Sequence, residues 1–200
     1  KIGFIGHSEG ALIAPMVAAR NLDVAFVVML AGPGVPGKDV ILKQSEAIMK
    51  AMKASPAEIK KSRDSQLKFI AAVDAVVRKN PSNPDPNKLV AALKKETDAL
   101  IAALPLADRI EAQKNRAMVD AQVQQFATPW FRYFLNYDPR TALRKVKVPV
   151  LVMNGDKDLQ VIASQNVPEV EKALRTGGNK RVTVRLMPGL NHLFQHTETG

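Results

Sequence analysis

The chain has 200 residues, of which 46% are hydrophobic and 24% charged, with a formal net charge of +10 and no cysteine. These proportions are ordinary for a globular protein with one sizeable core, and the sequence has no apolar run long enough to cross a bilayer. The lack of cysteine excludes disulfides and thiolate metal sites, but it fits either a reducing or an oxidising compartment. The sequence therefore leaves the compartment open.

The basic excess lies almost entirely in the middle of the chain. Residues 38–148 hold 21 lysines and arginines against 12 acidic residues, which accounts for +9 of the net charge. These basic residues are interspersed with acidic ones, as in Lys94-Lys95-Glu96, and they form no stripe with interleaved aromatics. We interpret the charge as solvated helix faces, and we expect no nucleic-acid partner and no membrane insertion. Attraction to acidic substrates, to a membrane surface or to nucleic acid is the alternative.

The first ten residues carry the motif on which the interpretation depends. An apolar run from Ile2 to Ile5 leads into Gly6-His7-Ser8-Glu9-Gly10, and an alanine-rich segment over 11–20 follows. This order predicts a strand, a sharp turn with Ser8 at its apex, and a helix. The pattern Gly-x-Ser-x-Gly in that context is typical of the nucleophile elbow of serine hydrolases.

The elbow makes two structural demands. We expect both of its glycines to be required, because side chains there would collide with the neighbouring strand and helix. We also expect strained backbone angles at Ser8. For the pentapeptide alone, an ordinary glycine-rich turn between strand and helix is the alternative.

Three further apolar segments predict an α/β core. The run over 24–31 is typical of a strand buried on both faces of a parallel sheet, and it ends in the glycine- and proline-rich loop 32–37. Strands are predicted over 148–153 and 181–187, with a helix over 163–176 between them. Residues 1–37 and 147–200 would form this core, with ligand sites at the carboxyl ends of its strands.

Between the second and third predicted strands the pattern becomes helical. Apolar residues recur at helical spacing from Lys38 to about Asn136, without a strand pattern. A helix is expected to begin at Ser55-Pro56, segment 80–86 is expected to be a loop, and 108–126 to be one helix. We therefore expect residues 38–146 to form a helical insertion.

One stretch near the end of this insertion is unusually aromatic. Residues 130–137 contain five of the ten aromatic residues in the chain. Aromatic side chains supply large apolar area with few rotors, which suits an acyl-binding wall or a joint between insertion and core. Plain core packing is the alternative for each of them.

A serine nucleophile needs an adjacent base that is itself oriented by a third group. Of the three histidines, His7 directly precedes Ser8, so its side chain should point away from the hydroxyl and be structural or line the pocket. His196 lies near the end of the chain. His192 follows the last predicted strand in a loop, and it is the candidate base.

Two acidic residues could orient this base. Asp156 and Asp158 both follow the strand predicted over 148–153, at the end where catalytic side chains are expected. The resulting chain order of serine, aspartate and histidine is that of the α/β-hydrolases.

These motifs resemble the α/β-hydrolase superfamily, and within it the serine esterases related to prolyl oligopeptidase-like and dienelactone hydrolase-like enzymes. The matching stretches are residues 2–10, 30–34, 149–161 and 186–195. The acid motif of the family, Gly-x-x-Asp, aligns Gly155 with Asp158, which the resemblance implies as the acid, with Asp156 as the alternative. The resemblance also implies that the helical insertion is a lid, and that no metal or organic cofactor is needed.

The activity implied by the resemblance is hydrolysis of small to medium acyl esters through an acyl-enzyme intermediate. Ser8 would attack the ester carbonyl, His192 would take its proton, Asp158 would orient the imidazole, and the backbone N–H of Glu9 would bind the oxyanion. Contacts with this small-molecule substrate are expected from four residues: His7, Pro33, Trp130 and Phe131.

Three other functions remain as alternatives. A serine peptidase or an acyltransferase would use the same fold, and a non-catalytic binding module is disfavoured by the intact triad. Because the family has strands before the elbow and a helix after the histidine loop, we expect the chain to be an internal fragment whose second oxyanion donor lies upstream. Acyl specificity and oligomeric state are left open.

Overall fold

The computed structural model describes residues 2–79 and 86–200, and in it the chain divides into two compact units. The first unit comprises Lys1–Ile59 and Asn136–Gly200, and the second comprises Lys60–Leu135. The loop predicted over 80–86 falls almost wholly outside the described residues. The role of residues 38–146 as a lid stays a prediction.

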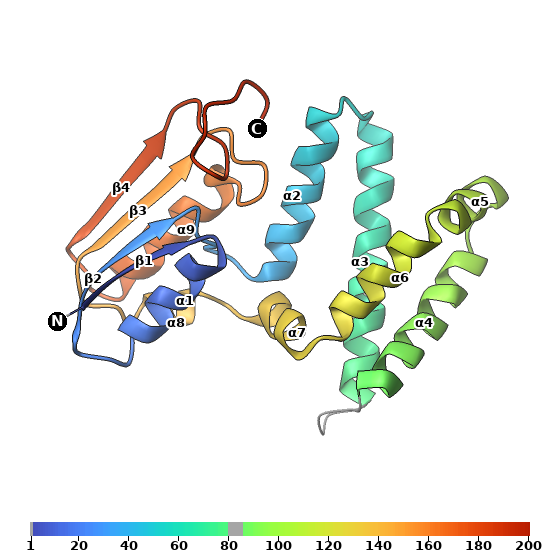
Figure 1. The fold of residues 1–200 in the computed structure, drawn as a ribbon, viewed down its shortest axis with the longest axis horizontal. Coiled ribbons are helices and arrows are strands. Elements are labelled where there is room, and N and C mark those ends of the chain that lie inside the picture. The colour runs from blue at the N-terminus through green and yellow to red at the C-terminus, as the bar shows by residue number, and fades with distance from the viewer. Residues whose placement is uncertain (1, 80–85) are drawn as a thin grey trace. The chain divides into compact units, whose positions relative to one another are not determined.

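The first unit is built on a four-stranded sheet in which each pairing is parallel and the strands follow in the order β1-β2-β3-β4 (Figure 1). The strands are β1 at Ile2–His7, β2 at Val24–Leu30, β3 at Val150–Gly155 and β4 at Val182–Met187. The predicted parallel α/β core is thereby confirmed. Because the strands are parallel, their carboxyl ends lie along one edge of the sheet.

Three helices cover one face of this sheet: α1 at Glu9–Ala18, α8 at Arg140–Leu143 and α9 at Ala163–Thr176. Small residues of α1 such as Ala11 and Ala14 pack against Val27 and Met29 of β2, and α9 packs against β3 and β4. The opposite face is open within the described residues, where the Ile5 side chain is 70% exposed. This open face departs from the two-sided burial that is usual for parallel sheets.

From residue 38 to about residue 136 the described part of the chain contains helices joined by short loops and no strand, as predicted. Helix α2, Gly37–Ala51, belongs to the first unit, and the second unit holds most of α3, Pro56–Lys79, with α4, Pro86–Ala102. Helix α3 begins where it was predicted to begin. The Ser55 hydroxyl accepts from the Glu58 N–H at 3.3 Å, and the Glu58 carboxylate accepts from the Ser55 N–H at 2.8 Å, which forms a capping box.

The single helix predicted over 108–126 is wrong. Two helices occupy this segment, α5 at Leu106–Lys114 and α6 at Arg116–Ala127, and they are followed by α7 at Pro129–Asn136. The break falls at Asn115, whose side-chain amide donates to the Glu111 carbonyl at 3.1 Å. Asparagine side chains compete in this way with helical backbone bonds. None of the described helices combines the length and the apolar character needed to span a bilayer.

Candidate active site

Ser8 forms the turn between β1 and α1 and has φ of 53° and ψ of −114°. A positive φ is costly for a residue with a side chain, so the strain expected at the elbow is present. The backbone around it is held by two hydrogen bonds, from the Ser8 N–H to the Leu30 carbonyl at 2.8 Å and from the Ala11 N–H to the Ser8 carbonyl at 3.1 Å. The Ser8 side chain makes no capping hydrogen bond to α1.

The two elbow glycines differ in what their surroundings allow. A Cβ added to Gly6 would lie 2.1 Å from the Gly10 carbonyl oxygen, which confirms that Gly6 is required. A Cβ added to Gly10 would meet no heavy atom within 4 Å outside its chain neighbours and the backbone of its own helix, so the expectation of a clash was wrong there. The reason is that the backbone carbonyl of Gly10 crowds Gly6, while the Cα of Gly10 faces open space.

Replacement of these two glycines by alanine should therefore have different effects on stability. We expect Gly6→Ala to lower the free energy of unfolding by about 1–3 kcal/mol, because the added methyl group would collide with the Gly10 carbonyl. The matched control Gly10→Ala should raise it by about 0.5–1 kcal/mol, because glycine inside a helix is entropically unfavourable. Urea denaturation of both variants measures the difference, and equal losses would contradict the packing described here.

The candidate base and acid lie against each other. Nδ1 of His192 is 2.9 Å from Oδ2 of Asp158, and their side chains are only 8% and 0% exposed. The alternative acid, Asp156, is exposed, and its carboxylate accepts from the Gly189 N–H at 2.8 Å. Of the two aspartates left open by the sequence, Asp158 is the one in contact with His192.

Three further donors fix the Asp158 carboxylate. Oδ1 accepts from the backbone N–H groups of Gln160 at 2.8 Å and Val161 at 2.9 Å. Oδ2, which faces His192, also accepts from the side-chain amide of Asn154 at 3.1 Å. Asn154 is 1% exposed, and its contact with Asp158 was not predicted from the sequence. Its position as a polar residue at the end of an apolar strand was the available signal.

The loop that follows β4 and carries His192 is called the histidine loop below. The absence of a side chain at Gly155 lets this loop approach the end of β3. A Cβ there would lie 2.0 Å from the Leu190 carbonyl, which accepts from the Lys157 N–H at 3.0 Å. The loop is also closed on itself, because the Asn191 side-chain oxygen accepts from two later backbone N–H groups at 3.0 Å each. These contacts give a physical reason for the glycine in the Gly-x-x-Asp motif.

His7 lies at the carboxyl end of β1 and contacts the histidine loop. Its Nε2 is 2.8 Å from the His192 carbonyl oxygen, and the two imidazole centroids are 4.8 Å apart. Since a carbonyl only accepts, His7 Nε2 is the donor. Glu9, the predicted oxyanion donor, is the first residue of α1, and the N-terminus of a helix favours negative charge.

The remaining predicted substrate contacts lie in two different units. Pro33 is buried in the loop after β2, which is tied to α9 by a hydrogen bond from the Gly34 N–H to the Asn166 side chain at 2.9 Å. Trp130 and Phe131 belong to α7 in the second unit, where Phe131 is 6% exposed and Trp130 is 49% exposed. The substrate roles of these residues stay predictions.

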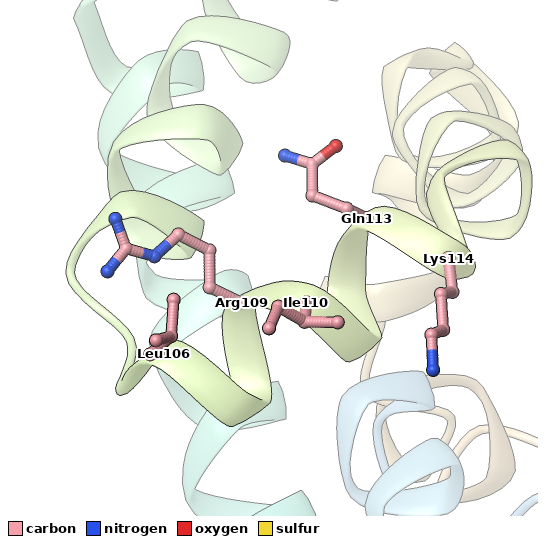
Figure 2. Close-up of a pocket in the computed structure, with 5 residues that line it drawn as sticks. All are labelled: Leu106, Arg109, Ile110, Gln113 and Lys114. Carbon is pink, nitrogen blue, oxygen red and sulfur yellow. The ribbon is translucent and has the colours of Figure 1, made fainter.

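Two hollows lie among the described residues of the second unit. The hollow in Figure 2 has a volume of about 510 Å³ and is lined by side chains of α5 alone, namely Leu106, Arg109, Ile110, Gln113 and Lys114. Because only one helix lines this hollow, it is an open depression of the surface. Another hollow of about 280 Å³ lies among side chains of α3, α4 and α6, including Phe69 and Val119. Within residues 2–79 and 86–200 no cluster of three histidines or acidic residues could hold a metal ion.

The parallel sheet, with a strained serine turn after β1, an aspartate after β3 and a histidine after β4, places the chain in the α/β-hydrolase superfamily. A family model matches residues 1–103, just over half of the sequence, including the elbow. The chain belongs to that family, which is described as BAAT / acyl-CoA thioester hydrolase C terminal.

Several solved structures are similar to this chain at low sequence identity. An esterase from Pyrococcus furiosus is 16% identical with a TM-score of 0.44, and the match covers 94% of this chain and 44% of that one. An α/β fold family hydrolase from Bacillus anthracis is 20% identical with a TM-score of 0.43, over 96% of this chain and 61% of that one.

The acylaminoacyl peptidase of Pyrococcus horikoshii is 10% identical with a TM-score of 0.45, over 96% of this chain and 20% of that one. The chain thus spans between a fifth and about three fifths of the length of these structures. No curated protein matches the sequence.

Proposed function

We propose that this chain is a serine hydrolase that cleaves carboxylic esters of small to medium acyl chains through Ser8, His192 and Asp158. The observation that carries the proposal is the buried contact of 2.9 Å between His192 Nδ1 and Asp158 Oδ2. Both residues follow strands whose carboxyl ends share one edge of the sheet with the Ser8 turn.

The proposed reaction begins with nucleophilic attack. Asp158 accepts a hydrogen bond from the protonated Nδ1 of His192. In this tautomer Nε2 is unprotonated and able to take the proton of the Ser8 hydroxyl. The Ser8 oxygen then bonds to the acyl carbon, and the alcohol leaves with the proton that His192 returns. Water releases the acyl group from Ser8 in a second round, with His192 again acting first as base and then as acid.

The oxyanion of each tetrahedral intermediate is assigned to the N-terminus of α1. The backbone N–H of Glu9 follows the nucleophile directly, which is the position of one oxyanion donor in α/β-hydrolases. A donor of this kind contributes about 3–4 kcal/mol to stabilisation of the transition state. Pro33, Trp130 and Phe131 are the proposed substrate contacts. For His7 we favour the structural alternative, because its Nε2 donates to the His192 carbonyl at 2.8 Å.

A second candidate activity, hydrolysis of acyl-CoA thioesters, is favoured by the family match over residues 1–103. The same triad would serve, with a thiolate leaving in place of an alkoxide. A peptidase or an acyltransferase would also use these residues, and a non-catalytic binding module would use none of them.

Substrate profiling separates these candidates. The longest reading frame that contains this chain would be assayed with p-nitrophenyl acetate, butyrate and octanoate, with the matching acyl-CoA thioesters, and with an amino-acid p-nitroanilide. We expect the esters to give the highest kcat/KM. A preference for the thioesters would select the second candidate, and a folded protein that turns over none of these compounds would overturn both.

A further inference from the structure

We infer that His7 is a positioning residue that ties the loop of the base His192 to the nucleophile elbow; this inference rests on the proposed function. Ser8 directly follows His7 in the chain, and the His7 side chain donates to the His192 main chain at 2.8 Å. One side chain therefore links the segment that carries the nucleophile with the segment that carries the base.

The histidine loop needs such a tie because neither a helix nor a strand holds His192. The loop follows the end of β4 at Met187 and carries Phe194 with a φ of 59°, an unfavourable value for a residue with a side chain. Asp158 holds only the His192 ring, at Nδ1. The His7 hydrogen bond is made to the His192 backbone, so it restrains the main-chain position from which the imidazole projects.

The ring of His7 restrains the loop in a second way. It lies 4.8 Å from the His192 imidazole at an interplanar angle of 46°, and 6.3 Å from the Phe194 ring in an edge-on arrangement. His7 itself is part of β1, where it pairs with Leu30 of β2. The restraint is thus anchored in the sheet.

Loss of the His7 hydrogen bond is expected to cause a moderate decrease in kcat. A small displacement of a base from its reactive geometry lowers the rate without changing the chemistry. Because the His7 side chain is exposed, its hydrogen bond competes with water, and we expect its loss to lower kcat by about tenfold. KM should change by less than about twofold, since the bond holds no substrate.

Two amide replacements make the test specific. In His7→Gln the amide N–H falls near the position of Nε2 and can still reach the His192 carbonyl, whereas in His7→Asn the amide falls near Nδ1 and cannot. We expect kcat to fall about tenfold in His7→Ala and His7→Asn, and to stay within about threefold of the parent in His7→Gln. His196→Ala, which changes the other histidine of this segment, is the control and should leave kcat unchanged.

Amide hydrogen exchange gives a second measurement that needs no activity. Exchange of residues 191–195 should be about tenfold faster in His7→Ala and His7→Asn than in the parent protein or His7→Gln. Unchanged exchange and kcat in His7→Ala would overturn the inference, as would a rise in KM alone, which would make His7 a substrate contact. Activity that persists in Ser8→Ala would reject the proposed function instead. Amide hydrogen exchange would then still test whether the His7 hydrogen bond restrains the loop that carries His192.

Discussion

Asp158→Asn is expected to lower kcat by about 10⁴-fold, because an amide cannot hold His192 in the tautomer that a base requires. In the parent protein the Asp158 carboxylate accepts from the His192 ring at 2.9 Å and from the Gln160 and Val161 N–H groups. The amide of the variant can accept at its oxygen only, and its NH₂ group would face donors. Ester turnover under substrate saturation measures the effect.

Asp156→Asn is the matched control for this substitution. Asp156 lies two residues away in the same loop, and its Oδ1 accepts from the Gly189 N–H at 2.8 Å, which an asparagine oxygen can also do. We expect kcat to change by less than about threefold. A severe loss in Asp156→Asn with little effect of Asp158→Asn would reverse the assignment of the acid.

His192→Ala is expected to lower kcat by at least about 10⁴-fold, the largest loss alongside that of the nucleophile. The other histidines offer no replacement: the Nε2 of His7 donates to the His192 carbonyl, and His196 is exposed. The double variant with Asp158→Asn should be no slower than His192→Ala alone, because the two residues act as one unit. Additive losses in the double variant would contradict that coupling.

Much of the fold was predictable because strong local patterns agree with the tertiary structure. The apolar run that becomes β2, the helix at Ala163–Thr176 and the helix start at Ser55-Pro56 depend on neighbouring residues alone. The break at Asn115 was missed because periodicity continues on both sides of it. The steric freedom of Gly10 could not be foreseen either, because a sequence motif does not show which atoms face open space.

The candidate site was predictable as a set of residues but not as an arrangement. Chain order favoured a serine, an aspartate and a histidine, and the Gly-x-x-Asp motif of the resemblance favoured Asp158 over Asp156. The contact with His192 could be seen only in the structure, where Asp158 touches the imidazole and Asp156 accepts from Gly189. The Asn154 amide reaches Asp158 over only four residues, but this contact depends on how the loop after β3 folds back. The His7 contact with His192 joins residues 185 positions apart. Such contacts depend on strand register and loop closure, which local pattern does not specify.

Covalent labelling of Ser8 tests the central proposal most directly. The protein would be treated with a fluorophosphonate, and intact mass with peptide mapping would locate the adduct, beside a Ser8→Ala variant that is verified to be folded. We predict one adduct per chain on Ser8, none in Ser8→Ala, and loss of ester turnover in step with labelling. A folded parent protein that takes up no probe, or that is labelled equally after Ser8→Ala, would contradict the assignment of Ser8 as the nucleophile.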